Sequence, residues 1–409
     1  MDDNDVVIVG GARTPFCEWL GGKRGDGGQG GRLASISAEE LGSIAIKGAL
    51  EKTGTEPSEV DHVIMGHALQ TSSQAIFGAR RAGILSGIPH QVPMLTINRL
   101  CGSGAQSVVS AAQMIMLGEA QTVVAGGMEN LSQAPHVLRG MRDTFRLGRP
   151  PKEGHELSKD MEDYLFTNLL DMQCGSFMAQ TSDELCSRKG VKRQDADAFA
   201  VISHTRTASS IDSGLFDEEI VSVETPDGIV GPKDEDHVVR GTNEESLSGL
   251  RAAFGPDSLV TAGNASGIND GASALVLANE KQAKKGNPMA KIISYGFGGV
   301  EPDEMGLGPI PASKMALKKV GLSIEDLDLV ESNEAFAAQA CAVNKELGLD
   351  EAKVNVNGGA IALGHPVGAT GSIIMTKLVH ELKRRNGKYG LATMCIGGGQ
   401  GIAVIIENC

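Results

Sequence analysis

The sequence predicts an α/β fold made of two related halves with a segment inserted between them. Short aliphatic runs alternate with helical patterns along most of the chain, as in folds whose helices cover a sheet. The chain also repeats itself: a shift of 267 residues lays 47–68 on 314–335 without a gap, with eight of 22 positions identical. A second match, at a shift of 264, lays Cys101 on His365. We therefore expect two copies of one α/β unit.

The first half opens with a buried strand at 6–9 that ends in two glycines. A helix is expected at 37–52, because Ser37 is a good N-cap and Glu40, three residues later, completes a capping box. A second strand is expected at 63–66. This order of strand and helix is the first repeat of the unit.

The loop that begins at Cys101 opens an aliphatic helix, and a strand at 122–125 follows it. In the second half, strands are expected at 327–330 and 391–394, the latter ending in a run of glycines. Each of the two repeated loops therefore leads through a helix to a strand that ends in glycines.

The segment between the halves differs in character. It is polar, lacks a strong strand rhythm, and contains one expected helix at 195–210 and a loop-rich stretch at 225–240. A long insertion on an α/β scaffold usually covers a site or joins subunits. The predicted domains are a first half of 1–130 with 268–287, an inserted loop domain of 131–267 for ligand binding and oligomerisation, and a second half of 288–409.

Composition and charge narrow the class of protein. Glycine makes up 54 of 409 residues, about 13%, against about 7% on average, and its place beside aliphatic runs indicates tight turns. The net charge of −14 argues against nucleic acid or an anionic membrane as a partner. Seven cysteines without a CxxC pair, an acidic start and no long apolar run favour a reduced, cytoplasmic protein without a metal site.

Cys101 is the first candidate for chemistry. It ends an extended run and precedes a helix, with two glycines after it that bare the backbone. A thiol at a helix N-terminus is expected to have a lowered pKa. A buried, inert cysteine is the alternative, but this position favours a nucleophile.

His365 occupies the matching place in the second half, and Pro366 after it suits the first position of a helix. If the halves pack about a local dyad, the two loops meet, and a thiol beside an imidazole is an activated nucleophile. Cys395 ends a strand before three glycines whose N–H groups could hold an oxyanion. From the residues alone, Cys395 is a disulfide partner, a spectator or an acid/base, and Asn333 is either a turn residue or a site residue.

Five ordered segments make the chain resemble the thiolase family over nearly its whole length. Other motifs fail: Gly102 to Ser107 lacks the third glycine of a dinucleotide fingerprint, and no HExxH zinc motif is present. The segments that carry the resemblance are Asn98-Arg99-Leu100-Cys101-Gly102-Ser103-Gly104, Thr261-Ala262-Gly263-Asn264-Ala265-Ser266-Gly267, Asn333-Glu334-Ala335-Phe336, Gly364-His365-Pro366 and Cys395-Ile396-Gly397-Gly398-Gly399.

The resemblance implies a fold of two duplicated βαβαβαββ halves, layered α-β-α-β-α, with a loop domain between them and usually a homotetramer. It also implies a reaction, the condensation of two acetyl-CoA to acetoacetyl-CoA and CoA. In that reaction Cys101 carries the acetyl group, His365 takes its proton and Cys395 acts as the base on the second substrate. His365 with an Asn333-held water would stabilise the enolate, and the N–H groups of Cys101 and Gly397 the tetrahedral oxyanion.

No permanently bound cofactor is implied; coenzyme A thioesters are the substrates. The family's contacts to coenzyme A fall by local match on Met178, Arg240, Phe254, Ser266, Met305 and Phe336. Phe177 replaces the histidine usual in short-chain members, and the loop 16–37 is longer than usual, so acyl-chain length stays open. A longer-chain 3-ketoacyl-CoA thiolase of fatty-acid oxidation is the near alternative, and a non-catalytic thiolase-like scaffold subunit is the alternative of another class.

Overall fold

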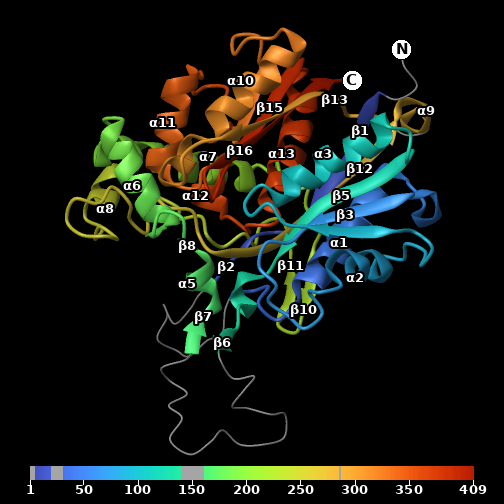
Figure 1. The fold of residues 1–409 in the computed structure, drawn as a ribbon, viewed down its shortest axis with the longest axis horizontal. Coiled ribbons are helices and arrows are strands. Elements are labelled where there is room, and N and C mark those ends of the chain that lie inside the picture. The colour runs from blue at the N-terminus through green and yellow to red at the C-terminus, as the bar shows by residue number, and fades with distance from the viewer. Residues whose placement is uncertain (1–4, 20–30, 140–160, 285–286) are drawn as a thin grey trace, which may run out of the picture.

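The computed structural model describes residues 5–19, 31–139, 161–284 and 287–409. Figure 1 shows the two halves side by side, the N-terminal half in blue to cyan and the C-terminal half in orange to red. The inserted segment, in green and yellow, lies along one side of both. The chain therefore has the α/β organisation that the repeat predicts.

The N-terminal half has the complete βαβαβαββ order. Its elements are β1 (Val6–Arg13), α1 (Ala38–Thr53), β3 (His62–Gly66), α2 (Gly78–Leu85), β4 (Met94–Ile97), α3 (Ser103–Met116), β5 (Thr122–Glu129) and β12 (Asn269–Asn279). The capping box of Ser37 and Glu40 is present at the start of α1, as the sequence predicts. Two short elements, β2 (Cys17–Glu18) on the edge of β12 and η1 (Pro57–Glu59), complete this half.

The C-terminal half follows the same order with one reduction. Its elements are β13 (Ala290–Gly299), η4 (Pro302–Leu307), α10 (Pro309–Val320), β14 (Leu329–Ser332), α11 (Ala337–Leu347), α12 (Ala360–Leu363), α13 (Thr370–Arg385), β15 (Tyr389–Ile396) and β16 (Gln400–Asn408). The place of a third strand is taken by a single bridge between Val330 and Val354. The short α9 (Glu280–Ala283) joins the two halves.

The described strands form one ten-stranded sheet in the order β14-β15-β16-β13-β1-β12-β5-β3-β4, with β2 beside β12. The halves join where β1 pairs with β13. Helices α3 and α13 are packed between the inner faces of the two halves, where Val108 and Leu378 meet Leu275 and Val404 in one core. Helices α1 and α2 cover the outer face of the first half, and α10 and α11 that of the second. The layering is therefore α-β-α-β-α.

The identities of the repeat mark equivalent backbone duties. Gly54 ends α1 and Gly321 ends α10, both with left-handed φ values of 65° and 68° that favour glycine. Asp61 accepts the N–H groups of Gln121 and Thr122 at 2.8 and 3.0 Å. Its counterpart Asp328 accepts those of Lys388 and Tyr389 at 2.6 and 3.0 Å. The duplication is thus visible in hydrogen bonds as well as in topology.

The inserted segment is built from short elements around one long helix. The expected helix at 195–210 is α7 (Arg193–Asp212), and the loop-rich stretch contains a small hairpin. The other elements are η2 (Leu131–Gln133), β6 (His136–Leu138), β7 (Met161–Asp163), α5 (Tyr164–Asn168), β8 (Leu170–Asp171), β9 (Ser176–Phe177), α6 (Met178–Arg188), β10 (Val223–Thr225), β11 (Gly228–Val230) and α8 (Glu244–Ser248). Residues 140–160 of this predicted domain, and 20–30 of the long first loop, lie outside the described residues.

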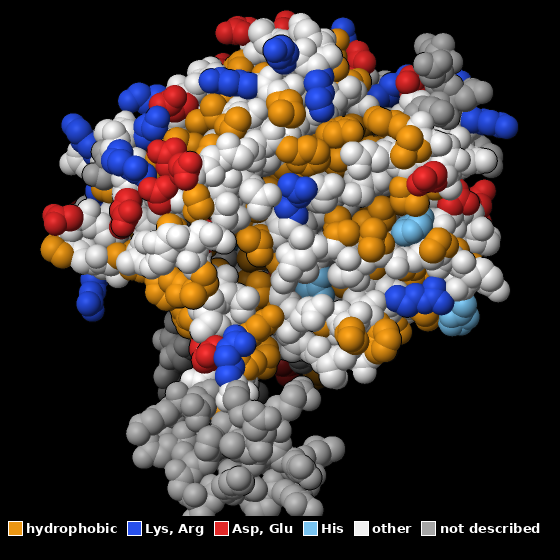
Figure 2. Space-filling model, in the orientation of Figure 1, with side chains coloured by type: hydrophobic (Ala, Val, Ile, Leu, Met, Phe, Trp, Pro, Cys, Tyr) orange, Lys and Arg blue, Asp and Glu red, His pale blue; other side chains and the backbone are white. Residues whose placement is uncertain are grey.

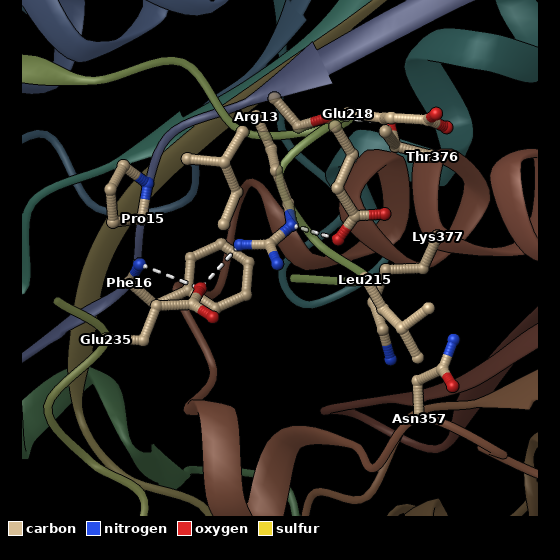
Figure 3. A network of polar contacts seen from close by, with 12 residues as sticks. Arg13, Pro15, Phe16, Leu215, Glu218, Glu235, Asn357, Thr376 and Lys377 are labelled. Atoms are coloured by element: carbon tan, nitrogen blue, oxygen red, sulfur yellow. Dashed lines mark hydrogen bonds and ion pairs between the residues drawn. The ribbon is translucent and has the colours of Figure 1, made fainter. Parts of the chain in front are cut away.

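A buried arginine ties the inserted segment to the first half. Arg13, at the end of β1, donates to Glu219 at 2.7 Å and to Glu235 at 2.5 Å, as Figure 3 shows. Its guanidinium also lies 4.6 Å from the ring centre of Phe16 and 5.0 Å from that of Phe216. Because breaking a buried ion pair leaves an uncompensated charge, this anchor fixes the insertion against the sheet.

Candidate active site

The two repeated loops meet where α3 and α13 touch. A Cβ on Gly104 would lie 2.6 Å from the backbone nitrogen of Ser372, and one on Gly371 would lie 2.1 Å from that of Ala105. Only glycine permits so close an approach. The N-terminal ends of these central helices are therefore in direct contact, and the loop of Cys101 faces the loop of His365, as the sequence predicts.

The loop before Cys101 is held in a strained conformation. Leu100 has a φ of 47°, unusual for a residue with a side chain, and its N–H donates to the Asn98 side chain at 2.8 Å. Gly102 packs against Ile396, where a Cβ would lie 2.4 Å from that side chain. The thiol of Cys101 is left partly exposed at the tip. Such strain is typical of functional positions.

The pKa expected for Cys101 is corrected by its surroundings. Burial raises the pKa of the Cys101 thiol to about 11, while the N–H groups of Gly397 and of Cys101 itself act in the opposite direction. Desolvation outweighs these donors because the thiolate would lose most of its water. The sequence-based prediction of a lowered pKa is thus wrong for the ligand-free protein. The thiol needs a base, although both N–H groups point at its sulfur.

His365 is oriented to be that base. Its Nδ1 lies 2.6 Å from the Thr370 hydroxyl, and this hydroxyl donates its only proton to the carbonyl of Pro366 at 2.9 Å. Nδ1 therefore carries the proton, which leaves Nε2 as a bare acceptor. Nε2 is buried and without a hydrogen-bond partner, and burial lowers the pKa of His365 to about 4. The imidazole is neutral near pH 7 and ready to accept a proton.

The position of Pro366 differs from expectation. Helix α13 begins at Thr370, four residues after Pro366, so Pro366 is not its first residue. The extra residues form the turn that brings the Thr370 hydroxyl back to His365. The longer loop thus provides the partner that selects the tautomer of the histidine.

Cys395 lies at the end of β15 and is buried, with Met305 and Ala335 packed around it. Burial, and secondarily Cys101, raise the pKa of its thiol well above the usual range. Both Cys101 and Cys395 are free cysteines, so the structure pairs neither in a disulfide. The two sulfurs belong to one site.

Asn333 follows β14, and both polar atoms of its side chain are buried without a hydrogen-bond partner. Its neighbour Glu334 is different, since its carboxylate accepts from Ser203 at 2.6 Å, Asn355 at 2.8 Å and the N–H of Ile361 at 3.1 Å. A buried amide without partners is costly, so it indicates a place for a water or a ligand. Of the two alternatives for Asn333, the site residue is favoured, whereas Glu334 is structural.

The glycine turn after Cys395 is shaped by a residue that sequence reasoning missed. Gly398 and Gly399 both have φ values of 78°, and the N–H of Gly398 donates to Asp171 at 3.0 Å. This bond orients the turn and leaves the N–H of Gly397 directed at Cys101. Asp171 lies in the inserted segment and carries no motif, so only its distance from the turn in space reveals the role.

Four of the six residues matched to coenzyme A contacts gather around Cys395. Met178 and Phe336 pack against Met305, and the N–H of Ser266 donates to the carbonyl of Ala335 at 3.1 Å. The other two lie on the surface of the inserted segment: Arg240 pairs with Asp212 at 2.8 Å, and Phe254 is 41% exposed. The apolar wall of the site is thus identified, and its outer rim is polar.

Two classes of site are not seen in the part of the chain that the structure describes. Its described residues hold no cluster of three or more His, Cys, Asp or Glu side chains suited to a metal. None of the described helices has the length and apolarity needed to cross a bilayer. The chemistry of the site therefore centres on its thiols, its imidazole and its backbone N–H groups.

A free thiol, a neutral imidazole and paired backbone donors on a duplicated α/β fold define a thiol-dependent acyl-transferring enzyme. Comparison with known proteins specifies the family. Residues 6–281 match the N-terminal domain of thiolase, and residues 286–408 match its C-terminal domain. The chain belongs to the thiolase family, and it is an acyltransferase.

Relatives of two kinds are similar to the chain over its length. The acetyl-CoA acetyltransferase of Cupriavidus necator is 46% identical over 409 residues, 99% of each chain. The human mitochondrial 3-ketoacyl-CoA thiolase is 46% identical over 407 residues, 98% of each chain. The crystal structure of that human enzyme in complex with CoA has a TM-score of 0.90 at 45% identity and covers 99% of this chain and 98% of its own. The family prediction and the fold prediction are confirmed.

Proposed function

We propose that the protein catalyses the reversible condensation of two acetyl-CoA molecules to acetoacetyl-CoA and CoA, through an acetyl group on Cys101. The observation that carries the proposal is the bare, buried Nε2 of His365, on a loop that meets the loop of the Cys101 thiol. Similarity to acetyl-CoA acetyltransferases supports the choice of substrate. Each step follows from a group already in place.

In the first half-reaction Cys101 attacks the thioester carbonyl of acetyl-CoA. His365 Nε2 takes the thiol proton, and the departing CoA thiolate later receives it, so the acetyl group and the proton are both accounted for. The N–H groups of Cys101 and Gly397 stabilise the tetrahedral oxyanion. One such donor is worth about 3 to 4 kcal/mol.

In the second half-reaction Cys395 removes a proton from the methyl group of another acetyl-CoA. The enolate oxygen is held by His365 and by a water bound to Asn333, whose amide lacks a protein partner. The enolate carbon then attacks the acetyl-Cys101 carbonyl, forms the new C–C bond and expels the Cys101 sulfur, which regains a proton from Cys395. Thiolysis is the reverse.

For coenzyme A binding we propose the wall of Met178, Met305, Phe336 and Ser266 along the pantetheine, with Phe254 beside it and Arg240 near the adenine. CoA thioesters enter as substrates, and no cofactor is held permanently. Support comes from the packing of three of these side chains around Cys395 and from the CoA complex of a solved relative. An apolar wall with few polar groups is typical of such sites.

The decisive experiment is to incubate the protein with acetyl-CoA and locate the acetyl group by peptide mass spectrometry, and then to follow loss of acetoacetyl-CoA absorbance with added CoA. We expect an acetyl group on Cys101 and turnover in the thiolysis direction. A protein that binds CoA but is neither acetylated nor active would instead be the non-catalytic scaffold.

A longer-chain 3-ketoacyl-CoA thiolase is the second candidate. It is favoured by the equal identity to the human mitochondrial enzyme and by Phe177, which stands where short-chain members have histidine. The two functions differ in kcat/KM, so substrates with four carbons are compared with those of eight to twelve. A higher kcat/KM for the longer chains would replace our first choice.

We also propose that the enzyme is a homotetramer, a dimer of dimers, in the cytoplasm. Strand β4 is an open edge of the sheet, and Leu95, Ile76 and Phe77 beside it are 46, 74 and 59% exposed. Figure 2 shows hydrophobic side chains gathered across this face of the molecule. Exposed apolar edges are typical of surfaces covered by another copy. Seven free thiols suit a reducing compartment.

Light scattering on the wild type and on Leu95→Lys tests the assembly. The wild type is expected to have four times the mass of one chain and the variant a smaller mass, while Leu117→Lys, at an exposed position on the far end of α3, serves as the control. A wild type that elutes as a monomer would reject this part of the proposal.

A further inference from the structure

Glu129 is a buried carboxylate that the reaction does not use. It is the last residue of β5 and is fully shielded from solvent. Its two oxygens accept the backbone N–H groups of Ala68 at 3.1 Å, Leu69 at 3.2 Å and Gly368 at 2.7 Å. The first two belong to the N-terminal half and the third to the C-terminal half. One side chain therefore joins loops that are about 300 residues apart.

The N-terminal arm of this contact leads to the nucleophile. The carbonyl of Ala68 accepts from the Asn98 side chain at 2.9 Å, and the other end of that amide accepts the N–H of Leu100 at 2.8 Å. Leu100 is the residue with positive φ directly before Cys101. An unbroken series of hydrogen bonds thus runs from Glu129 to the strained residue that sets the direction of the thiol.

The C-terminal arm leads to the base. Gly368 lies three residues after His365, in the turn between that histidine and α13. The turn has no slack, because a Cβ on Gly127 would lie only 2.2 Å from the carbonyl oxygen of Gly368. Besides Glu129, the backbone of this loop is held by a bond from the His365 N–H to Gly267 at 3.2 Å. Glu129 is therefore the polar contact that ties the histidine loop to the nucleophile's half.

We infer that Glu129 is a positioning residue that sets the geometry between the Cys101 sulfur and His365 Nε2. The inference rests on the proposed function, since it assigns a role in activating the same thiol. Glu129 does not touch the reacting atoms. It acts through Gly368 on one side and through Ala68 and Asn98 on the other, so its loss changes the alignment of the pair and leaves the coenzyme A wall in place.

The test is a double-mutant cycle between Glu129→Gln and Asn98→Ala, read by the rate at which iodoacetamide alkylates Cys101 at pH 7. Each single change is expected to slow alkylation about tenfold, as loss of one aligned hydrogen bond does. The double variant is expected to lose about tenfold as well, because both changes interrupt the same series of bonds. In thiolysis, kcat is expected to fall in parallel, with KM within about twofold of the wild type.

Asp61→Ala is the matched control, because it removes a carboxylate that accepts two backbone N–H groups at the opposite end of the same half. It is expected to lower the melting temperature without slowing alkylation. Unchanged alkylation in both single variants, or a roughly hundredfold loss in the double variant, would overturn the inference.

Two further outcomes are also decisive. If Glu129→Gln does not fold, Asn98→Ala alone decides: slowed alkylation at unchanged melting temperature supports the role, and unchanged alkylation rejects it. If the wild type shows no thiolase turnover, the proposed function fails. The alkylation series then still decides on Glu129, because it measures the thiol without the reaction.

Discussion

The two halves of the molecule share a scaffold and differ in the loops that the scaffold presents. The scaffold duties are equal in both: Gly54 and Gly321 end equivalent helices, and Asp61 and Asp328 hold equivalent strands. The loops differ in length. In the first half the central helix starts two residues after Cys101, whereas in the second it starts five residues after His365. The added turn supplies the threonine that orients the histidine.

This difference divides the chemistry unequally between the halves. The N-terminal half provides the nucleophile, while the C-terminal half provides His365, Asn333, Cys395 and the N–H of Gly397. Duplication therefore supplied a rigid frame in which one loop kept a short turn for a thiol and its counterpart lengthened for a base. Changes in the loops should affect reaction steps, and changes in the frame should affect stability.

The largest effect is expected from the two cysteines. Cys101→Ala removes the nucleophile, so acetylation and turnover should both fall by about 10⁴-fold or more. Cys395→Ala keeps the nucleophile, so the enzyme should still be acetylated by acetyl-CoA but should fail to form acetoacetyl-CoA. Rapid-quench mass spectrometry measures the two steps separately. Equal loss of acetylation in both variants would contradict the division between the halves.

His365→Asn should reduce acetylation by about 10² to 10⁴-fold, the usual worth of a general base. In the wild type the pKa of His365 is lowered to about 4, so the imidazole stays a base down to that pH and acetylation should fall only as the pH drops through about 4. The variant should lose this limb. A wild-type limb near pH 6.5 would mean that the histidine is not shielded.

The same lowered pKa affects stability. The unfolded chain binds a proton on this histidine below about pH 6.5, the folded chain only below about 4, so folding stability is lost as the pH falls between these values. His365→Asn removes that contribution. Urea unfolding at pH 7 and pH 5 should therefore show a smaller acid loss in the variant than in the wild type.

Much of the fold was accessible from the sequence because it depends on local rules and on repetition. The capping box at Ser37, the buried strands and the shift of 267 residues sufficed to predict two α/β halves. The meeting of Cys101 with His365 followed from the repeat alone. These features are repeated or short-range, so one sequence contains them in full.

What the sequence did not reveal depends on burial and on contacts across the chain. The raised pKa of Cys101 follows from desolvation, which no motif encodes, and the helix start at Thr370 rather than at Pro366 follows from a turn stabilised by His365. Asp171 holds the glycine turn from a region without a motif. Such residues become visible only when the distance between remote segments is known.

A smaller effect is expected from the contact between the two central helices. Gly371→Ala would place a Cβ 2.1 Å from the backbone nitrogen of Ala105, and backbone cannot yield as a side chain can. We expect a loss of about 2 to 3 kcal/mol in the free energy of unfolding, with slower acetylation because the loops are forced apart. Gly299→Ala, at an open position, is the control and should cost little. Equal stability of the two variants would argue against this contact.

The smallest effect is expected from the frame itself, where the halves should be interchangeable. Asp61→Ala and Asp328→Ala each remove an exposed carboxylate that accepts two backbone N–H groups, so each should cost about 1 kcal/mol in the free energy of unfolding. The sites lie in different halves and share no partner, so the double variant should lose the sum of the two. Urea denaturation of the three variants measures this. A cost in one half several times that in the other would show that the duplicated frame has diverged in its energetics while keeping its geometry, because the hydrogen bonds themselves are the same in both.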